Sequence, residues 1–324
     1  MGGSGLATLA VLLLIGAIFF LWGVNGPGPH ARLGPSTDVI LNPGSGVTEI
    51  AATLERDGVI NSSLVFIVAS KLAGGRLLAG EYDIPSGASM AAVIEKLRKG
   101  EIVHHLITIP EGFTAEETVQ VLMDSPFLTG AAPVPTEGAL LPETYEVRRG
   151  DDRGAVLQRM IDARDALVRT MWVQRRADLP FQNPEQAVIL ASIVEKETSL
   201  PDERPRVAAV FVNRLERGIK LQSDPTIIYG LTRGKPLGRG ILESELTQPT
   251  PYNTYVISGL PPTPICNPGR ASLAAVLDPP HTDELYFVAS GSGGHLFSST
   301  LEQHQKNVAH LRALERRMAD GNPH

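Results

Sequence analysis

Residues 183–198 read NPEQAVILASIVEKET and predict the helix around which the larger part of the chain is organised. Asn183 suits the N-cap, and Pro184 suits the first helical position. Pro201 cannot continue a helix, so we expect this one to end before it. The apolar run between these signals is long enough to form a buried core element.

Glu197 lies at the end of this helix on its apolar face. At about 100° per residue, Leu190, Val194 and Glu197 fall on one stripe, whereas Glu195 lies about 160° away. Burial and the negative end of the helix dipole both raise the pKa of Glu197, as a general acid requires. The alternative is that Glu197 is a salt-bridged helix residue and that Glu195 lies on the surface or supports the site indirectly.

Composition narrows the class of protein. The chain has 324 residues, enough for two domains, and its net charge of -6 does not favour nucleic acid as a partner. Cys266 is the single cysteine, so no internal disulfide forms, and we interpret it as a packed side chain instead of a nucleophile. The spacing of His104 and His105 does not suggest zinc, and we expect neither a metal nor a cofactor.

An uncharged apolar segment, residues 5–24, stands near the N-terminus. About 20 such residues span a bilayer as a helix, and Trp22 suits the interface. A cleaved signal peptide is the alternative, although the run is long for one and no small-x-small cleavage site follows it. We therefore predict an anchor at residues 1–24, including a short N-terminal head.

The remaining chain predicts an α+β fold in two domains. Residues 25–43 are rich in Gly and Pro and predict a linker. A small domain at 44–109 contains helices near 47–56, 62–72 and 89–99 and strands near 80–85 and 103–109. In the 62–72 helix the apolar face is formed by Leu64, Val65, Val68 and Leu72.

A second domain covers 110–318, and a polar tail covers 319–324. Its predicted helices lie near 114–123, 153–173, 184–197, 205–217, 271–277 and 301–318. Strands near 284–289 and 295–298 flank a Ser/Gly-rich turn and predict a hairpin.

Several strings in this second domain resemble the MltG/YceG-like endolytic murein transglycosylases. They occur in the family's order over roughly residues 106–310, and they are ASIVEKET at 191–198, DER at 202–204, VFVNRL at 210–215, LQSDPT at 221–226, YG at 229–230, YNTY at 252–255, GLPP at 259–262, NPG at 267–269, YFV at 286–288 and GH at 294–295. The anchor and the small domain, which resembles a LysM-like module, also fit this family's layout. The missing basic head departs from it.

The resemblance implies a lyase that cuts the MurNAc–GlcNAc β-1,4 bond of nascent peptidoglycan and leaves 1,6-anhydroMurNAc ends. It implies Glu197 as the catalytic acid and then base. It also places the catalytic domain outside the cytoplasmic membrane, with glycan strands, and cell-wall synthases, as partners. A muramidase-type hydrolase and a non-catalytic peptidoglycan-binding scaffold are the alternative classes.

Five further residues are predicted to bind substrate: Gln222, Asp224, Tyr252, Asn253 and Tyr255. Aromatic rings stack on sugar faces and amides pair with N-acetyl groups. The alternative is that the tyrosines and amides only hold a Pro-rich loop together. Asp224 is the one candidate for a second carboxylate, or it caps a short helix that starts with Pro225.

Overall fold

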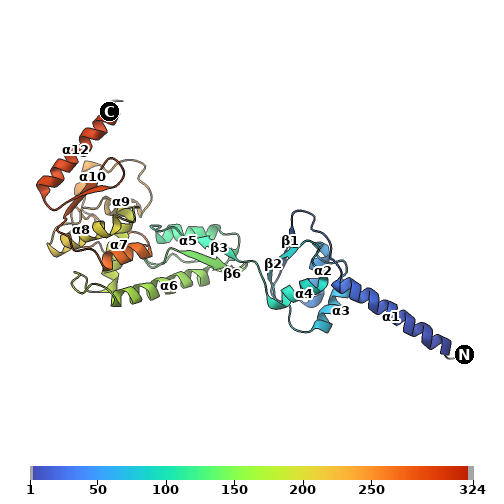
Figure 1. Cartoon of the computed structure of the whole chain (residues 1–324). Helices are drawn as coiled ribbons and strands as arrows, with labels where there is room; N and C mark the ends of the chain where they lie inside the picture. The colour runs from blue at the N-terminus through green and yellow to red at the C-terminus, as the bar shows by residue number, and fades with distance from the viewer. Residues whose placement is uncertain (1–2, 320–324) are drawn as a thin grey trace. The chain divides into compact units, whose positions relative to one another are not determined.

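The computed structural model describes residues 3–319, which form a mixed α+β protein (Figure 1). The chain divides into two compact units. The first contains everything up to Leu106 together with Pro126–Leu128 and Glu146–Asp151. The second contains Ile107–Ser125, Thr129–Tyr145 and the chain from Asp152 onward. The predicted N-terminal head, Met1 to Ser4, lies partly outside the described residues, as do residues 320–324 of the predicted polar tail.

The first unit begins with an apolar helix and continues as a small α+β body. Its elements are α1 (Gly3–Asn25), β1 (Ser36–Leu41), α2 (Val47–Arg56), α3 (Ser63–Ala73), β2 (Gly80–Pro85) and α4 (Met90–Lys99). Strands β1 and β2 pair antiparallel, with Val39 opposite Tyr82, and both side chains are buried. Inward-facing residues of the two strands meet the buried faces of α2, α3 and α4 in one core.

Helix α1 is long and apolar enough to cross a membrane. The span Ala7–Asn25 has 19 residues and no charged side chain, and none of its residues is fully buried, although Phe20 and Val24 pack against the core of the first unit. A signal sequence has the same length and composition, so the helix by itself fits both readings.

Two predictions for this unit are wrong. The second half of the expected linker, 25–43, contains the core strand β1, in which Val39 and Leu41 point into the core. The strand has few apolar residues, so the sequence did not indicate it. In α3 the buried residues are Phe66, Ala69 and Ser70, whereas three residues of the predicted face are exposed: Leu64, Val68 and Leu72. Helix α3 is apolar on nearly every side, so periodicity did not identify the face that packs.

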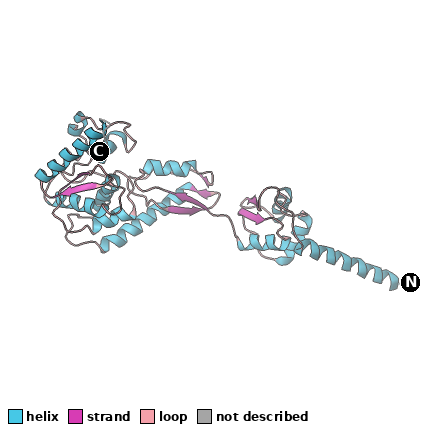
Figure 2. Cartoon of the chain, turned by 45° about the horizontal axis from the view of Figure 1, so that its top comes forward, coloured by secondary structure: helices cyan, strands magenta, loops and turns pink. Residues whose placement is uncertain are grey.

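The second unit is mainly helical, and the four short strands between residues 105 and 152 each have residues in both units (Figure 2). Strands pair as β3–β5, β4–β6 and β7–β8. From β3 onward the elements are β3 (His105–Thr108), α5 (Ala115–Asp124), β4 (Leu128–Thr129), β5 (Thr144–Val147), β6 (Asp151–Asp152), α6 (Arg153–Val173), α7 (Pro184–Glu197), α8 (Arg204–Glu216), α9 (Asp224–Thr232), α10 (Glu243–Thr247), α11 (Arg270–Leu277), β7 (Tyr286–Ala289), β8 (His295–Ser298) and α12 (Leu301–Ala319).

Helix α7 is the centre of this unit. It packs against α6, α8, α9 and α11, and every residue from Ala187 to Val194 is buried. Leu190, Phe211 and Val276, from α7, α8 and α11, belong to the same core. This packing fixes α7 in the core and leaves only its two end turns to reach the surface.

Candidate active site

Local sequence signals set both ends of α7. The Asn183 side chain accepts a hydrogen bond from the backbone N–H of Gln186, and Pro184 opens the helix. The backbone turns extended at Thr198, so Glu197 is the last helical residue. The prediction of this helix is confirmed at both ends, and the chain leaves α7 just where its last carboxylate meets a cavity.

A polar cavity of about 470 Å³ opens beside Glu197. Its walls come from α7, α8, the segment before α9, the start of α9, the loop after α10, the β7 strand and α12. The lining residues are Glu197, Arg214, Leu221, Gln222, Asp224, Tyr255, Phe287, Val288 and His304. Four of the predicted site residues therefore meet here: Glu197, Gln222, Asp224 and Tyr255.

The carboxyl of Glu197 is held in one orientation and in a protonatable state. The hydroxyl of Ser223 donates a hydrogen bond to its Oε1 at 2.5 Å. Burial raises the pKa of Glu197 to about 7; the Ser223 hydrogen bond and the Arg214 charge oppose this rise, and the Asp224 charge adds to it. A carboxyl with this pKa carries its proton in a large fraction of molecules at neutral pH.

Arg214 is a buried cation that ties the walls of the cavity together. Its Nε donates to the carbonyl of Leu285 at 2.6 Å, and its Nη1 donates to the carbonyls of Lys220 and Leu221 at 3.0 and 2.9 Å. A third acceptor for Nη1 is Gln222 Oε1 at 3.2 Å. Arg214 therefore fixes the segment before α9 to α8 and to the start of β7, while its charge acts on Glu197.

Asp224 faces the cavity, and the alternative that it caps a helix is wrong. Helix α9 begins at Asp224 itself and its N-cap is Ser223, whose side chain bonds Glu197 instead of the helix. Asp224 Oδ1 accepts a hydrogen bond from the Tyr255 hydroxyl at 2.6 Å. The Asp-Pro pair gave the helix start to within one residue but did not reveal which side chain points into the cavity.

Gln222 has an uncommon backbone conformation, with φ 53°, in the left-handed region. Its N–H donates to the carbonyl of Thr254 at 3.2 Å, and Ser223 N donates to Thr254 Oγ1 at 2.9 Å. Residues other than glycine that hold such strained conformations cluster at functional sites. Here it lets Gln222 line the cavity while the next residue bonds Glu197.

The other two predicted residues lie elsewhere. Tyr252 packs in the core with its ring 4.9 Å from that of Tyr229, and its hydroxyl lies 2.8 Å from Thr263 Oγ1. Asn253 is buried, and its amide donates to three carbonyls at the end of α10, those of Glu245, Leu246 and Gln248. The geometry favours the loop-packing alternative for both.

His304 reaches the cavity from α12 and was not predicted. Its ring stacks on Tyr286 with centroids 5.0 Å apart, and burial and the Arg214 charge lower its pKa, so the imidazole is neutral near pH 7. Its buried Nδ1 has no hydrogen-bond partner among the described residues. A lone histidine on a polar helix carries no sequence signal that it lines a cavity. Ser223 and Arg214 lie within the family motifs, but nothing else in the sequence indicated that they reach Glu197.

Glu195 is buried, not on the surface. Its side chain is 6% exposed, lies 3.6 Å from the Arg204 guanidinium, and accepts a hydrogen bond from Gly269 N at 2.9 Å. These contacts connect α7 with α8 and with the start of α11. Among the described residues, no group of three or more His, Cys, Asp or Glu side chains could hold a metal ion.

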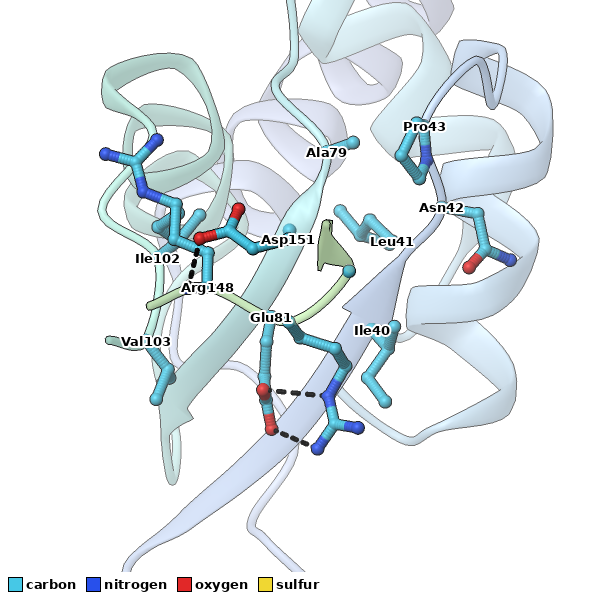
Figure 3. Close-up of a pocket in the computed structure, with 13 residues that line it drawn as sticks. Ile40, Leu41, Asn42, Pro43, Ala79, Glu81, Ile102, Val103, Arg148 and Asp151 are labelled. Carbon is cyan, nitrogen blue, oxygen red and sulfur yellow. Dashed lines mark hydrogen bonds and ion pairs between the residues drawn. The ribbon is translucent and has the colours of Figure 1, made fainter. Parts of the chain in front are cut away.

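A second cavity, of about 340 Å³, lies in the first unit (Figure 3). The carboxylate of Glu81 lies in its wall and accepts two hydrogen bonds from the Arg149 guanidinium. Its Oε2 also lies 2.6 Å from His105 Nε2. The Arg149 hydrogen bond leads the effects that lower the pKa of Glu81. An ionised, fully paired carboxylate is a poor proton donor, so the cavity beside Glu197 is the better candidate for acid catalysis.

A desolvated carboxyl that is protonatable at neutral pH in a polar cavity is the kind of group that general acid–base catalysis requires. A model of the YceG-like family matches residues 39–310. A Bacillus subtilis protein named endolytic murein transglycosylase is 30% identical over 329 residues, which cover 91% of this chain and 90% of that protein. The chain belongs to the YceG-like family.

Two further comparisons agree. Streptococcus pneumoniae proteins with the same name are 29% identical over 316 residues, and the match spans 82% of this chain but 56% of theirs. A 2.6 Å crystal structure of a putative YceG-like protein from Listeria monocytogenes superposes with a TM-score of 0.54 at 28% identity, covering 84% of this chain and 98% of that one. Similarity to named transglycosylases identifies the chain as an enzyme and confirms the family predicted from its motifs.

Proposed function

We propose that the protein is an endolytic peptidoglycan lytic transglycosylase. It cleaves the MurNAc–GlcNAc β-1,4 bond of nascent glycan strands and leaves 1,6-anhydroMurNAc ends. The observation that carries the proposal is the carboxyl of Glu197, whose pKa is about 7, at the wall of the polar cavity. The relatives named endolytic murein transglycosylase supply the substrate class.

The reaction needs one group that first gives and then takes a proton. Because Ser223 donates to Oε1 of Glu197, Oε2 is the oxygen that carries the acidic proton. That proton passes to the glycosidic oxygen as the bond from this oxygen to MurNAc C1 breaks. The MurNAc C6 hydroxyl then bonds to C1 and returns its proton to Glu197, so no water is consumed.

Other lining groups bind and orient the sugar in this proposal. Gln222 and the neutral His304 offer hydrogen bonds to N-acetyl and hydroxyl groups, and the Tyr255 ring offers a face for a pyranose. Arg214 supports the negative charge that Glu197 carries after giving up its proton. Tyr252 and Asn253 shape the adjoining loop through their own packing.

A muramidase-type hydrolase is the second candidate, because Asp224 lines the same cavity as Glu197. Hydrolysis of that kind uses a second carboxylate as nucleophile or as the base that activates water. The Tyr255 hydroxyl donates to Asp224, and this bond stabilises the carboxylate and weakens it as a nucleophile or base. The lytic reaction therefore fits the site better.

Glu197→Gln tests the catalytic assignment. The substitution keeps the shape of the side chain and removes the acid, so cleavage should fall by about 10² to 10⁴, the usual worth of a general acid. Glu195→Gln is the matched control on the same helical turn and should retain most of its rate when folded. If Glu197→Gln retains more than half of the activity, or changes nothing in the cell wall, the chain is a scaffold or acts through another residue.

We also propose that α1 is retained as a single-pass anchor of the cytoplasmic membrane, with the second unit on the extracytoplasmic side as the catalytic domain. The first unit serves as a LysM-like module that positions glycan; its β1–α2–α3–β2 order, with β1 and β2 antiparallel, supports this role. Cell-wall synthases are the expected protein partners. After a carbonate wash the protein should stay in the membrane fraction, and a soluble form starting near Gly26 would show a cleaved signal instead.

A further inference from the structure

Helix α3 carries an apolar stripe that the protein itself does not cover. Leu64, Val68 and Leu72 are 75%, 49% and 74% exposed and follow one another at four-residue spacing, so they lie on one side of the helix. The opposite side packs into the core through Phe66 and Ala69. Three large side chains in line form a surface that water solvates poorly.

This stripe belongs to the helix that meets the end of α1. A Cβ placed on Gly23 would lie 3.9 Å from Val65, the neighbour of Leu64. Phe20 and Val24, in the last turns of α1, pack against the core of the first unit. Trp22, between them, is 70% exposed.

The chain that follows α1 is not a free hinge. Gly28 N donates to the carbonyl of Gly87 at 3.1 Å, and Gly87 N donates to the carbonyl of Pro29 at 2.9 Å. A Cβ on Gly28 would overlap the carbonyl oxygen of Ala88. The first unit is therefore held against the end of α1 by packing and by backbone hydrogen bonds.

Length then fixes the depth of this unit in a bilayer. A bilayer core takes about 20 residues of helix, and α1 offers a span of 19, Ala7–Asn25. In a helix of about this length the last turns, which hold Phe20 and Val24, lie near the end of the bilayer core. These turns contact the first unit, so an α1 that spans the bilayer would place α3 at the level of the lipid headgroups.

Charge around the stripe matches an anionic lipid surface. No Asp or Glu occurs between Asp57 and Glu81, whereas Lys71 and Arg76 do. Lys71 and Arg76 are exposed, and Lys71 directly precedes Leu72 of the stripe. An apolar stripe flanked by basic residues is typical of helices that lie in the membrane interface.

We propose that the Leu64–Val68–Leu72 face of α3 is a membrane-contact surface that inserts between the headgroups of the bilayer crossed by α1. The proposal rests on α1 being a retained span. Two contacts with lipid, one by α1 and one by α3, prevent the first unit from turning about α1. The glycan-positioning module is thereby held at the membrane surface, where nascent strands emerge.

Spin-label accessibility in lipid nanodiscs tests this surface with the full chain. Val68→Cys and Leu72→Cys carry the label, and Ala52→Cys, an exposed α2 residue between Glu49 and Glu55, is the control. The native cysteine is fully buried and should stay unlabelled. Oxygen gathers in the acyl chains, and a nickel chelate stays in water.

We expect oxygen to relax the labels at 68 and 72 more than nickel does, and the order to reverse at 52. Phosphatidylglycerol should strengthen the oxygen effect at 72, and Lys71→Glu with Arg76→Glu should abolish that gain. If the labels at 68 and 72 behave like the one at 52, the stripe is left for a protein partner and the proposal is wrong. If the chain fails to copurify with the discs, α1 is not an anchor, and the proposals of a retained anchor and of a membrane-contact surface are both wrong. The proposed cleavage by Glu197 does not depend on this result, because it is measured in a separate assay.

Discussion

Replacing Ser223 by alanine should move the pH dependence of cleavage to higher pH. The Ser223 hydroxyl donates to Glu197 Oε1 and lowers the pKa of this carboxyl against the effect of burial. A hydrogen bond to a charged group is worth about 1.5–3 kcal/mol, and 1.36 kcal/mol corresponds to one pKa unit. Part of that bond persists with the neutral acid, so we expect a rise of about one unit.

Asp224→Asn should have the opposite effect. The Asp224 charge raises the pKa of Glu197, and its contribution is smaller than that of the Ser223 hydrogen bond. Removing the charge stabilises the ionised form of Glu197 and lowers its pKa. The shift should therefore be downward and smaller than the upward shift of Ser223→Ala.

The assay is kcat/KM for glycan cleavage as a function of pH. A general acid works in its protonated form, so the wild-type rate should fall above about pH 7. This descending limb should move to higher pH in Ser223→Ala and to lower pH in Asp224→Asn. Ser272→Ala removes a buried hydroxyl that has no partner among the described residues, and it should leave the limb in place. Equal limbs in all variants, or shifts of the same sign, would refute the assignment of Glu197 as the acid.

Three further predictions concern single side chains. Glu195→Gln weakens a buried ion pair with Arg204, so urea unfolding should show a loss of up to about 3 kcal/mol, while the folded enzyme still cleaves; loss of cleavage at unchanged stability would contradict this role. Glu197 has a folded pKa of about 7, above its usual 4.5, so its favourable contribution is complete below pH 4.5 and is lost as pH rises toward 7. Glu197→Gln avoids this loss, so the melting temperature of the variant minus that of the wild type should be larger at pH 8 than at pH 5. The change in the free energy of unfolding behind this difference is at most about 3 kcal/mol. An equal difference at both pH values would count against the raised pKa of Glu197. Tyr255→Phe should slow cleavage about tenfold, because the ring loses the hydrogen bond to Asp224 that holds it in place for the sugar. Tyr252→Phe should cost about 1 kcal/mol of stability and leave the rate unchanged. The reverse pattern would place Tyr252 in the site.

The sequence predicted the part of the site that local rules determine. The caps predicted α7, and spacing put Glu197 on the side of Leu190 and Val194. Because α7 is buried on every side from Ala187 to Val194, spacing did not show that Glu195 is buried as well. Asp224 and Tyr255 were predicted from motif context and meet in the cavity. Substrate binding by these residues stays a prediction.

What the sequence did not show depends on long-range packing. Ser223 looked like an ordinary residue before a helix, and only the contact of α9 with α7 turns its hydroxyl toward Glu197. His304 lies far along the chain on a polar helix, and its place follows from how α12 crosses β7. In α3, apolar residues on every side removed the contrast that periodicity needs, and the packed side was set by the shape of the core.

Mass spectrometry of the products tests the central claim most directly. Purified glycan strands are digested with the full chain in water enriched in oxygen-18, and the new ends are analysed. We predict 1,6-anhydroMurNAc ends, lighter by one water than reducing ends and free of the isotope, and their absence with Glu197→Gln. Reducing ends that carry oxygen-18 would show hydrolysis and contradict the account.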